Sequence, residues 1–149
     1  MPLTLLAPLT QTFKLSSDAT NETFVVFRQA TMKQEEERQQ LLAIQEYAWN
    51  DKEAGVVSRK SRVNFAELAR KEVGLTMIEC NIMVQKGVND DGSPKIQPLF
   101  KFGKVGEPMR ELEFVEAWGQ LPADWANELQ KFCHEVNKDW APNSPPKEG

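Results

Sequence analysis

The only histidine of the chain, His134, directly follows Cys133, one of its two cysteines. A thiol and an imidazole within hydrogen-bond reach form the nucleophile and base of many cysteine enzymes. Neighbouring residues of a helix, however, point about 100° apart, so these two side chains do not face each other. Cysteine is also among the residue types that are most often buried. We therefore interpret Cys133 as a buried thiol and His134 as an exposed imidazole, rather than as a catalytic pair.

The other residues that could do chemistry are the paired carboxylates Asp90 and Asp91. They lie within Asn-Asp-Asp-Gly, which is typical of a turn. Cys80, Cys133 and His134 are too few to form the usual four-ligand zinc site. The sequence has no nucleophile elbow, phosphate-binding glycine loop, dinucleotide fingerprint or zinc-protease motif. We therefore expect no catalytic residue, no cofactor and no metal, and we expect that the protein is not an enzyme.

Composition narrows the class of partner. The chain has 149 residues, a length that predicts one domain. Its net charge is −4, and residues 75–149 carry all of it, with 8 basic and 12 acidic side chains. Phosphate binding needs clustered basic residues, so we expect no nucleic-acid partner; the one basic cluster, residues 58–62, is interpreted as a solvated loop. No apolar run approaches the roughly 20 residues of a membrane span, and no signal peptide is evident, so we expect a soluble protein without membrane contact.

The elements that must position these residues follow from hydrophobic periodicity and from helix start and stop signals. The predicted strands are residues 9–15, 23–30, 75–87 and 95–103, and the predicted helices are residues 31–50, 64–74, 108–119 and a last helix that begins at Leu121 and Pro122. The last two predicted strands form a hairpin around the turn at residues 89–94. The prediction is an α+β fold with a small, mainly antiparallel sheet and about four helices, two of them C-terminal.

The domain organisation is predicted as a polar N-terminal extension (1–22), a single α+β domain (23–140) and a disordered Pro-rich tail (141–149). Within the domain, Thr31 and Gln34 have the spacing of a capping box. The first two turns of this helix carry almost nothing apolar, so we expect them to project into solvent. Gly74 is expected to end the second helix.

The last helix carries one clean apolar face, and it raises an alternative that the sequence leaves open. The face consists of Trp125, Leu129, Phe132, Cys133 and Val136. It is either part of the core or a surface that binds a partner. The same alternative applies to the side of the first long helix that carries Leu41, Ile44 and Trp49, with Met32 at its start. Trp140 is either a clasp on the core or an anchor for a partner.

Three stretches in this order resemble the tail assembly chaperones of long-tailed bacteriophages. The first is FVVFRQAT (residues 24–31) before a charged helix. The second is CNI (80–82) followed by an acidic turn and PLFKFG (98–103). The third is FVEAWGQLPADWANELQKFCHEVNKDW (114–140), which is similar to a family ending with an aromatic helix, a Leu-Pro helix start and an Asn-Pro-x-Trp-like close. Lys138 stands where that close would have proline.

The resemblance implies a protein that binds the long tape measure protein and keeps its hydrophobic segments soluble during tail assembly. It also implies help in recruiting tail tube protein, action in the host cell cytoplasm and absence from the mature virion. Such a chaperone needs an apolar groove or stripe with a charged rim; the partner-binding candidates are Trp125, Leu129, Phe132, Val136 and Trp140. The alternatives are a structural virion component, such as a tail completion or connector protein, and a small regulatory protein that acts on a host enzyme. Whether the chain forms a homo-oligomer is left open.

Overall fold

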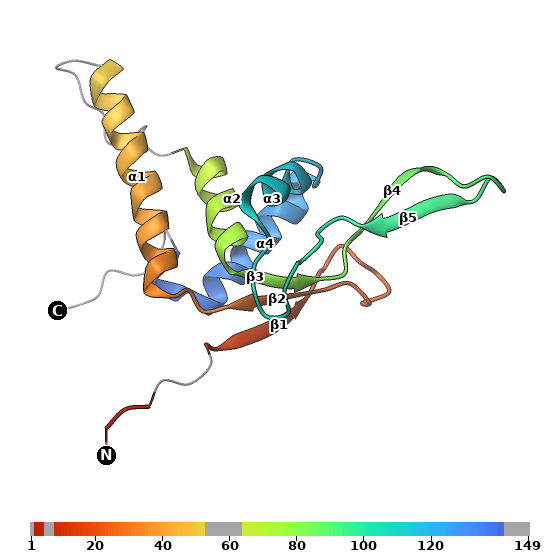
Figure 1. Cartoon of the computed structure of the whole chain (residues 1–149), viewed down its shortest axis with the longest axis horizontal. Helices are drawn as coiled ribbons and strands as arrows, with labels where there is room; N and C mark the ends of the chain where they lie inside the picture. Colours follow the sequence, from red (N-terminus) through yellow and green to blue (C-terminus); the bar gives the residue numbers. More distant parts are fainter. Residues whose placement is uncertain (1, 5–7, 53–63, 142–149) are drawn as a thin grey trace.

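The structure is a computed structural model that describes residues 2–4, 8–52 and 64–141, except for the side chains of residues 45–52. The elements, in chain order, are β1 (Thr10–Lys14), β2 (Phe24–Arg28), α1 (Met32–Lys52), α2 (Phe65–Thr76), β3 (Met77–Cys80), β4 (Met83–Val88), β5 (Pro94–Pro98), α3 (Glu111–Trp118), α4 (Ala123–Val136) and the 3-10 turn η2 (Lys138–Trp140) (Figure 1). The predicted α+β fold with four helices, two of them C-terminal, is confirmed. The strands form two small antiparallel sheets, one of three strands and one of two.

The three-stranded sheet has the order β1-β2-β3, with every pair antiparallel. Val25 and Phe27 of the central strand are fully buried, and helices α2, α3 and α4 lie on one side of the sheet (Figure 1). β1 runs from Thr10 opposite Arg28 to Lys14 opposite Phe24, and Leu15 directly after it is buried in the core. A domain boundary at residue 23 therefore falls inside the sheet, because β1 belongs to the same fold.

The predicted strand 75–87 is divided among three elements. Helix α2 continues through Gly74 to Thr76, and β3 pairs with β2, so only β4 forms the predicted hairpin with β5. The break falls at Asn81, whose side chain accepts the N–H of Phe24 at 2.8 Å. Gly74 is not a helix stop; a Cβ at this position would lie 2.9 Å from the Phe114 ring. Its small size is needed for the close approach of α3 to α2.

The start of α1 is packed against the domain, contrary to the expectation that it projects into solvent. The predicted capping box is present, since Thr31 N–H donates to Gln34 Oε1 at 2.9 Å and Gln34 N–H donates to Thr31 Oγ1 at 3.3 Å. Gln34 is buried, and its Nε2 donates to the carbonyl of Leu75 at 2.6 Å. Polar side chains therefore attach this end of the helix to the domain. For this reason the apolar pattern of the sequence did not predict that it packs there.

Three expectations concern residues outside the described part of the chain. They are the solvated basic loop at residues 58–62, the disordered tail at residues 142–149 and the role of the Trp49 side chain.

Candidate functional site

The apolar face of α4 lies largely in the core. Leu129 and Cys133 are fully buried and Val136 is 9% exposed, while Trp125 and Phe132 are half-buried and pack against the same core. The Phe132 ring stacks on Phe13 of β1, with ring centroids 4.6 Å apart. Leu129 therefore offers no surface to a partner in this conformation, because β2 and α2 cover this face of the helix.

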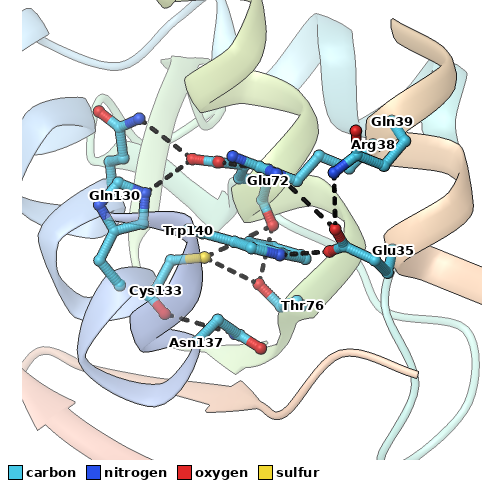
Figure 2. Close-up of polar contacts among 10 residues, drawn as sticks. Glu35, Arg38, Gln39, Glu72, Thr76, Gln130, Cys133, Asn137 and Trp140 are labelled. Atoms are coloured by element: carbon cyan, nitrogen blue, oxygen red, sulfur yellow. Dashed lines mark hydrogen bonds and ion pairs between the residues drawn. The ribbon is translucent and has the colours of Figure 1, made fainter. Parts of the chain in front are cut away.

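Trp140 is a clasp on the core. Its side chain is 6% exposed, and its indole N–H donates to the Glu35 carboxylate (Figure 2). The Arg38 guanidinium lies over the indole ring, 5.1 Å from its centroid. Both contacts join the end of the domain to the start of α1. These contacts are those expected of a clasp on the core, and the role of Trp140 toward a partner stays a prediction.

A buried ionic cluster lies where α1, α2 and α4 meet (Figure 2). Its centre is Glu72 of α2, whose side chain is fully buried. The Glu72 carboxylate accepts a hydrogen bond from Arg38 Nε at 2.7 Å and one from Gln130 Nε2 at 3.2 Å. His134 Nε2 lies 2.8 Å from Glu72 Oε1. The expectation of an exposed His134 imidazole is therefore wrong, because the side chain turns toward α2 to contact this carboxylate.

The cluster keeps its central carboxylate charged. Burial is the largest influence on Glu72 and by itself raises its pKa. Hydrogen bonds from His134, Arg38 and Gln130 together outweigh burial, so the pKa of Glu72 lies below its ordinary value. The contacts of this carboxylate come from α1 and α4, so the cluster joins these two helices to α2.

The thiol beside this cluster is protonated. Burial raises the pKa of Cys133 to about 12, and its Sγ lies 3.3 Å from Thr76 Oγ1. The neighbouring imidazole is engaged by Glu72 and not by this thiol. The sequence interpretation of Cys133 as a buried thiol is confirmed. Among the described residues, no group of three or more His, Cys, Asp or Glu side chains could hold a metal ion.

A groove of about 460 Å³ with a partly apolar lining lies between the start of α1, α2 and the start of α3, and we call it the α1–α3 groove. Its apolar lining consists of Gly74, Leu75, Pro108, Met109, Phe114 and Val115. Phe114 and Met109 are buried at its base, whereas Leu75 and Val115 are partly exposed. The groove therefore combines buried and accessible apolar side chains, as sites for small or helical ligands commonly do.

Charged side chains of both signs surround this floor. The basic ones are Arg28, Lys33, Arg70 and Lys71, and the acidic ones are Glu37, Glu107 and Glu111. Lys71 and Glu111 form an ion pair across the groove from α2 to α3, at 3.2 Å. Arg28 donates from Nη1 to the carbonyl of Gly106 at 3.1 Å, which ties β2 to the loop before α3. The rim therefore favours no single sign of charge, and the apolar floor is the distinctive part of the site.

A second hollow, of about 660 Å³, lies between the start of α1 and the C-terminal residues. Val136 and Trp140 contribute to its wall, together with the 72% exposed Met32. Most of its remaining lining is polar, so it fits an apolar client less well than the α1–α3 groove. Trp125, Leu129 and Phe132 line neither cavity.

Sequence reasoning missed both the ionic cluster and the groove. One signal was available for the cluster, because Glu72 occurs among Leu68, Ala69 and Val73 on the buried face of α2. A charged residue at such a position is almost never buried without a partner. The groove left no comparable signal, since its lining comes from four separate segments of the chain.

Comparison of the chain with protein-family models, with curated proteins and with solved structures found no match. Among the helices of the described residues, none combines the length and the apolar character that crossing a membrane would require.

Proposed function

We propose that this protein is a tail assembly chaperone of a long-tailed bacteriophage. In this role it binds the tape measure protein, keeps that protein soluble during tail assembly in the host cell cytoplasm, helps to recruit tail tube protein and is absent from the mature virion. The client is an apolar segment of the tape measure protein, and it lies in the α1–α3 groove.

The α1–α3 groove carries this proposal, because it pairs an apolar floor with a rim of both charge signs. An amphipathic helix can place its apolar side on such a floor and its charged flanks against such a rim. Other helix positions also leave large apolar side chains exposed: Ile44 at 65%, Phe65 at 60% and Leu112 at 86%. These residues support the proposal less strongly, since scattered apolar residues are common on protein surfaces. The choice of the tape measure protein as the client rests on the three sequence stretches, which resemble tail assembly chaperones in their order.

The test is an affinity pull-down of the tagged protein from phage-producing cells, with mass spectrometry of the eluate. The wild type is expected to recover a very long helical phage protein, with or without tail tube protein. Val115→Glu places a carboxylate in the apolar lining of the groove. Binding of an apolar client would desolvate this carboxylate, which is unfavourable. We expect recovery of the long protein to fall more than about tenfold, equivalent to a cost above about 1.4 kcal/mol.

Leu112→Glu is the matched control, because it makes the same charge change on the same helix but outside the groove lining. It is expected to recover the client as the wild type does. Equal losses in both variants would show that the groove is not the binding site. Recovery of a host enzyme, or of the tagged protein alone, by the wild type would refute the chaperone proposal. Far-UV circular dichroism of both variants excludes misfolding as the cause.

The second candidate is a structural virion component, such as a tail completion or connector protein. The β4–β5 hairpin favours it, because this hairpin projects from the body of the domain as an arm suited to assembly (Figure 1). That role predicts symmetric rings in light scattering of the purified protein.

A further inference from the structure

The β4–β5 hairpin, which we call the arm, has an apolar face without a partner among the described residues. The strand pairing places Met83 opposite Pro98, Gln85 opposite Ile96 and Val88 opposite Pro94. Met83, Gln85, Ile96 and Pro98 share one face of the hairpin, since directly opposed residues and alternate residues point the same way. Val88 and Pro94 are the next opposed pair, beyond an irregularity in the strand register between Gln85 and Val88. All six side chains are exposed, with Met83 and Ile96 at 55% and Val88 at 65%.

The other face of the arm is the one that meets the domain. Val84 and Gln97 are half-buried there, and they border a hollow shared with Glu113 and Glu116 of α3. The hairpin thus turns its more polar face toward the domain and its apolar face toward solvent. That is the reverse of the usual orientation, and an isolated two-stranded hairpin is only marginally stable in water. An additional strand would stabilise it.

The two edges of the arm differ in their ability to accept another strand. Leu99 N–H donates to the carbonyl of Ile82 at 3.0 Å, so the backbone of residue 99 points toward β4. By alternation, residues 94, 96 and 98 point away from β4, and two of these three are proline. Proline has no N–H to donate, so the outer edge of β5 is blocked.

The outer edge of β4 is open. The Ile82 carbonyl accepts the N–H of Leu99, directly after β5, so by alternation the backbone groups of Met83 and Gln85 point outward. No further strand lies along this side in the described residues, where the sheet has the two strands β4 and β5. Both outward residues keep an N–H, and no proline interrupts β4.

We propose that β4 pairs with β4 of a second copy of this chain, antiparallel and about a two-fold axis at Val84, to form a four-stranded sheet β5-β4-β4-β5. Met83 of each copy then lies opposite Gln85 of the other, and the two residues exchange backbone hydrogen bonds. The contact is isologous, so it closes as a dimer and does not propagate.

The charges along β4 are compatible with a second copy as the occupant. In this register Lys86 lies opposite Ile82 of the second copy, so no like charges are opposed. The apolar face carries no charged residue, and the two Met83 side chains meet diagonally across the new pair. The paired strands are short and bury less than the roughly 1,200 Å² of a stable interface, so the dimer is weak and depends on concentration.

The test is sedimentation velocity of the purified protein over a range of concentrations. The wild type is expected to shift from monomer to dimer as its concentration rises. Gln85→Pro removes one outward N–H from each copy and none of the bonds to β5. It is expected to raise the dimer Kd by more than about tenfold, since two hydrogen bonds are lost by symmetry.

Gln85→Thr is the matched control, because it changes the side chain but keeps the N–H, and it is expected to dimerise as the wild type does. Amide hydrogen exchange of the wild type gives an independent measurement: protection of the Met83 and Gln85 amides is expected to rise with concentration. A wild type that stays monomeric, that forms rings, or whose dimer survives Gln85→Pro unchanged would overturn the proposal, as would equal loss in Gln85→Thr. Dimerisation is measured without client, so its failure leaves the chaperone proposal standing.

Discussion

Replacement of Glu72 by Gln is expected to destabilise the domain strongly, because it removes the charge that Arg38 and His134 contact. The Glu72 side chain is fully buried, and those of Arg38 and His134 are 11% and 13% exposed. Removing one partner of a buried ion pair costs about 3–5 kcal/mol, since the other partner remains buried and uncompensated. Arg38 keeps its contacts with Glu35 and the Trp140 ring, so we expect the lower end, about 3 kcal/mol.

The assay is urea denaturation followed by circular dichroism, with thermal melting as a second measurement. For a domain of this size, 3 kcal/mol corresponds to a fall in Tm of about 6–12 °C. Glu67→Gln is the matched control, because Glu67 lies on the same helix but its ion pair with Arg70 is a third exposed and 3.8 Å long. It is expected to cost less than about 1 kcal/mol.

A double variant distinguishes the contribution of the ion pair to stability from the contribution of the volume that its side chains fill. Arg38→Met combined with Glu72→Met is expected to recover most of the loss, since well-packed apolar residues often replace a buried ion pair without cost. If Glu72→Gln changes the free energy of unfolding no more than Glu67→Gln does, the reasoning that Glu72 organises the helix junction is refuted.

Two further predictions concern the same helix. Because the pKa of Glu72 is lower in the folded state than its ordinary value of 4.5, its carboxylate stabilises the fold at pH values above 4.5, and this stability is lost as pH falls through the folded pKa. In denaturation at a series of pH values, the free energy of unfolding should therefore fall more steeply with acid in the wild type than in Glu72→Gln. Parallel curves would contradict this prediction. Gly74→Ala is expected to cost about 1–3 kcal/mol of unfolding free energy, because the new Cβ would lie 2.9 Å from the Phe114 ring. Gly119→Ala is its control, because nothing lies nearer than 3.6 Å to the new Cβ and alanine favours helix over glycine, so no loss is expected there. An equal loss in both variants would contradict the packing explanation.

The sequence was sufficient for most of the local structure. The capping box at Thr31 and Gln34, the turn before Pro94 and the end of α3 at Gly119 all depend on residues a few positions apart. Such short-range signals act through backbone sterics and local hydrogen bonds, so they are visible in one segment at a time. For the same reason the buried state of Cys133 followed from its place on an amphipathic helix.

Long-range packing decided the features that local signals predicted incorrectly. Gly74 is a common helix terminator, but here it lies against the Phe114 ring, α2 continues to Thr76 and β3 follows directly to pair with β2. His134 lies off the apolar face of α4, yet it is largely covered because Glu72, 62 residues earlier, accepts it. At the polar start of α1, Gln34 is buried and Arg38 is largely covered because Leu75 and Glu72 supply their hydrogen-bond partners. A polar side chain is buried at low cost only where a hydrogen-bond partner is available. When the partner lies far away in the sequence, the local sequence around the side chain cannot predict its burial.

What the sequence by itself determined is the set of four helices, the hairpin and the division of each helix into apolar and polar faces, because periodicity and capping are local properties. Only the tertiary structure decided which of those faces is covered. It placed Leu129 and Val136 in the core, formed the α1–α3 groove from separate segments and left the apolar face of the arm in solvent. Apolar periodicity is the same for a core face and for a docking face, and the two differ only in what the rest of the chain places against them.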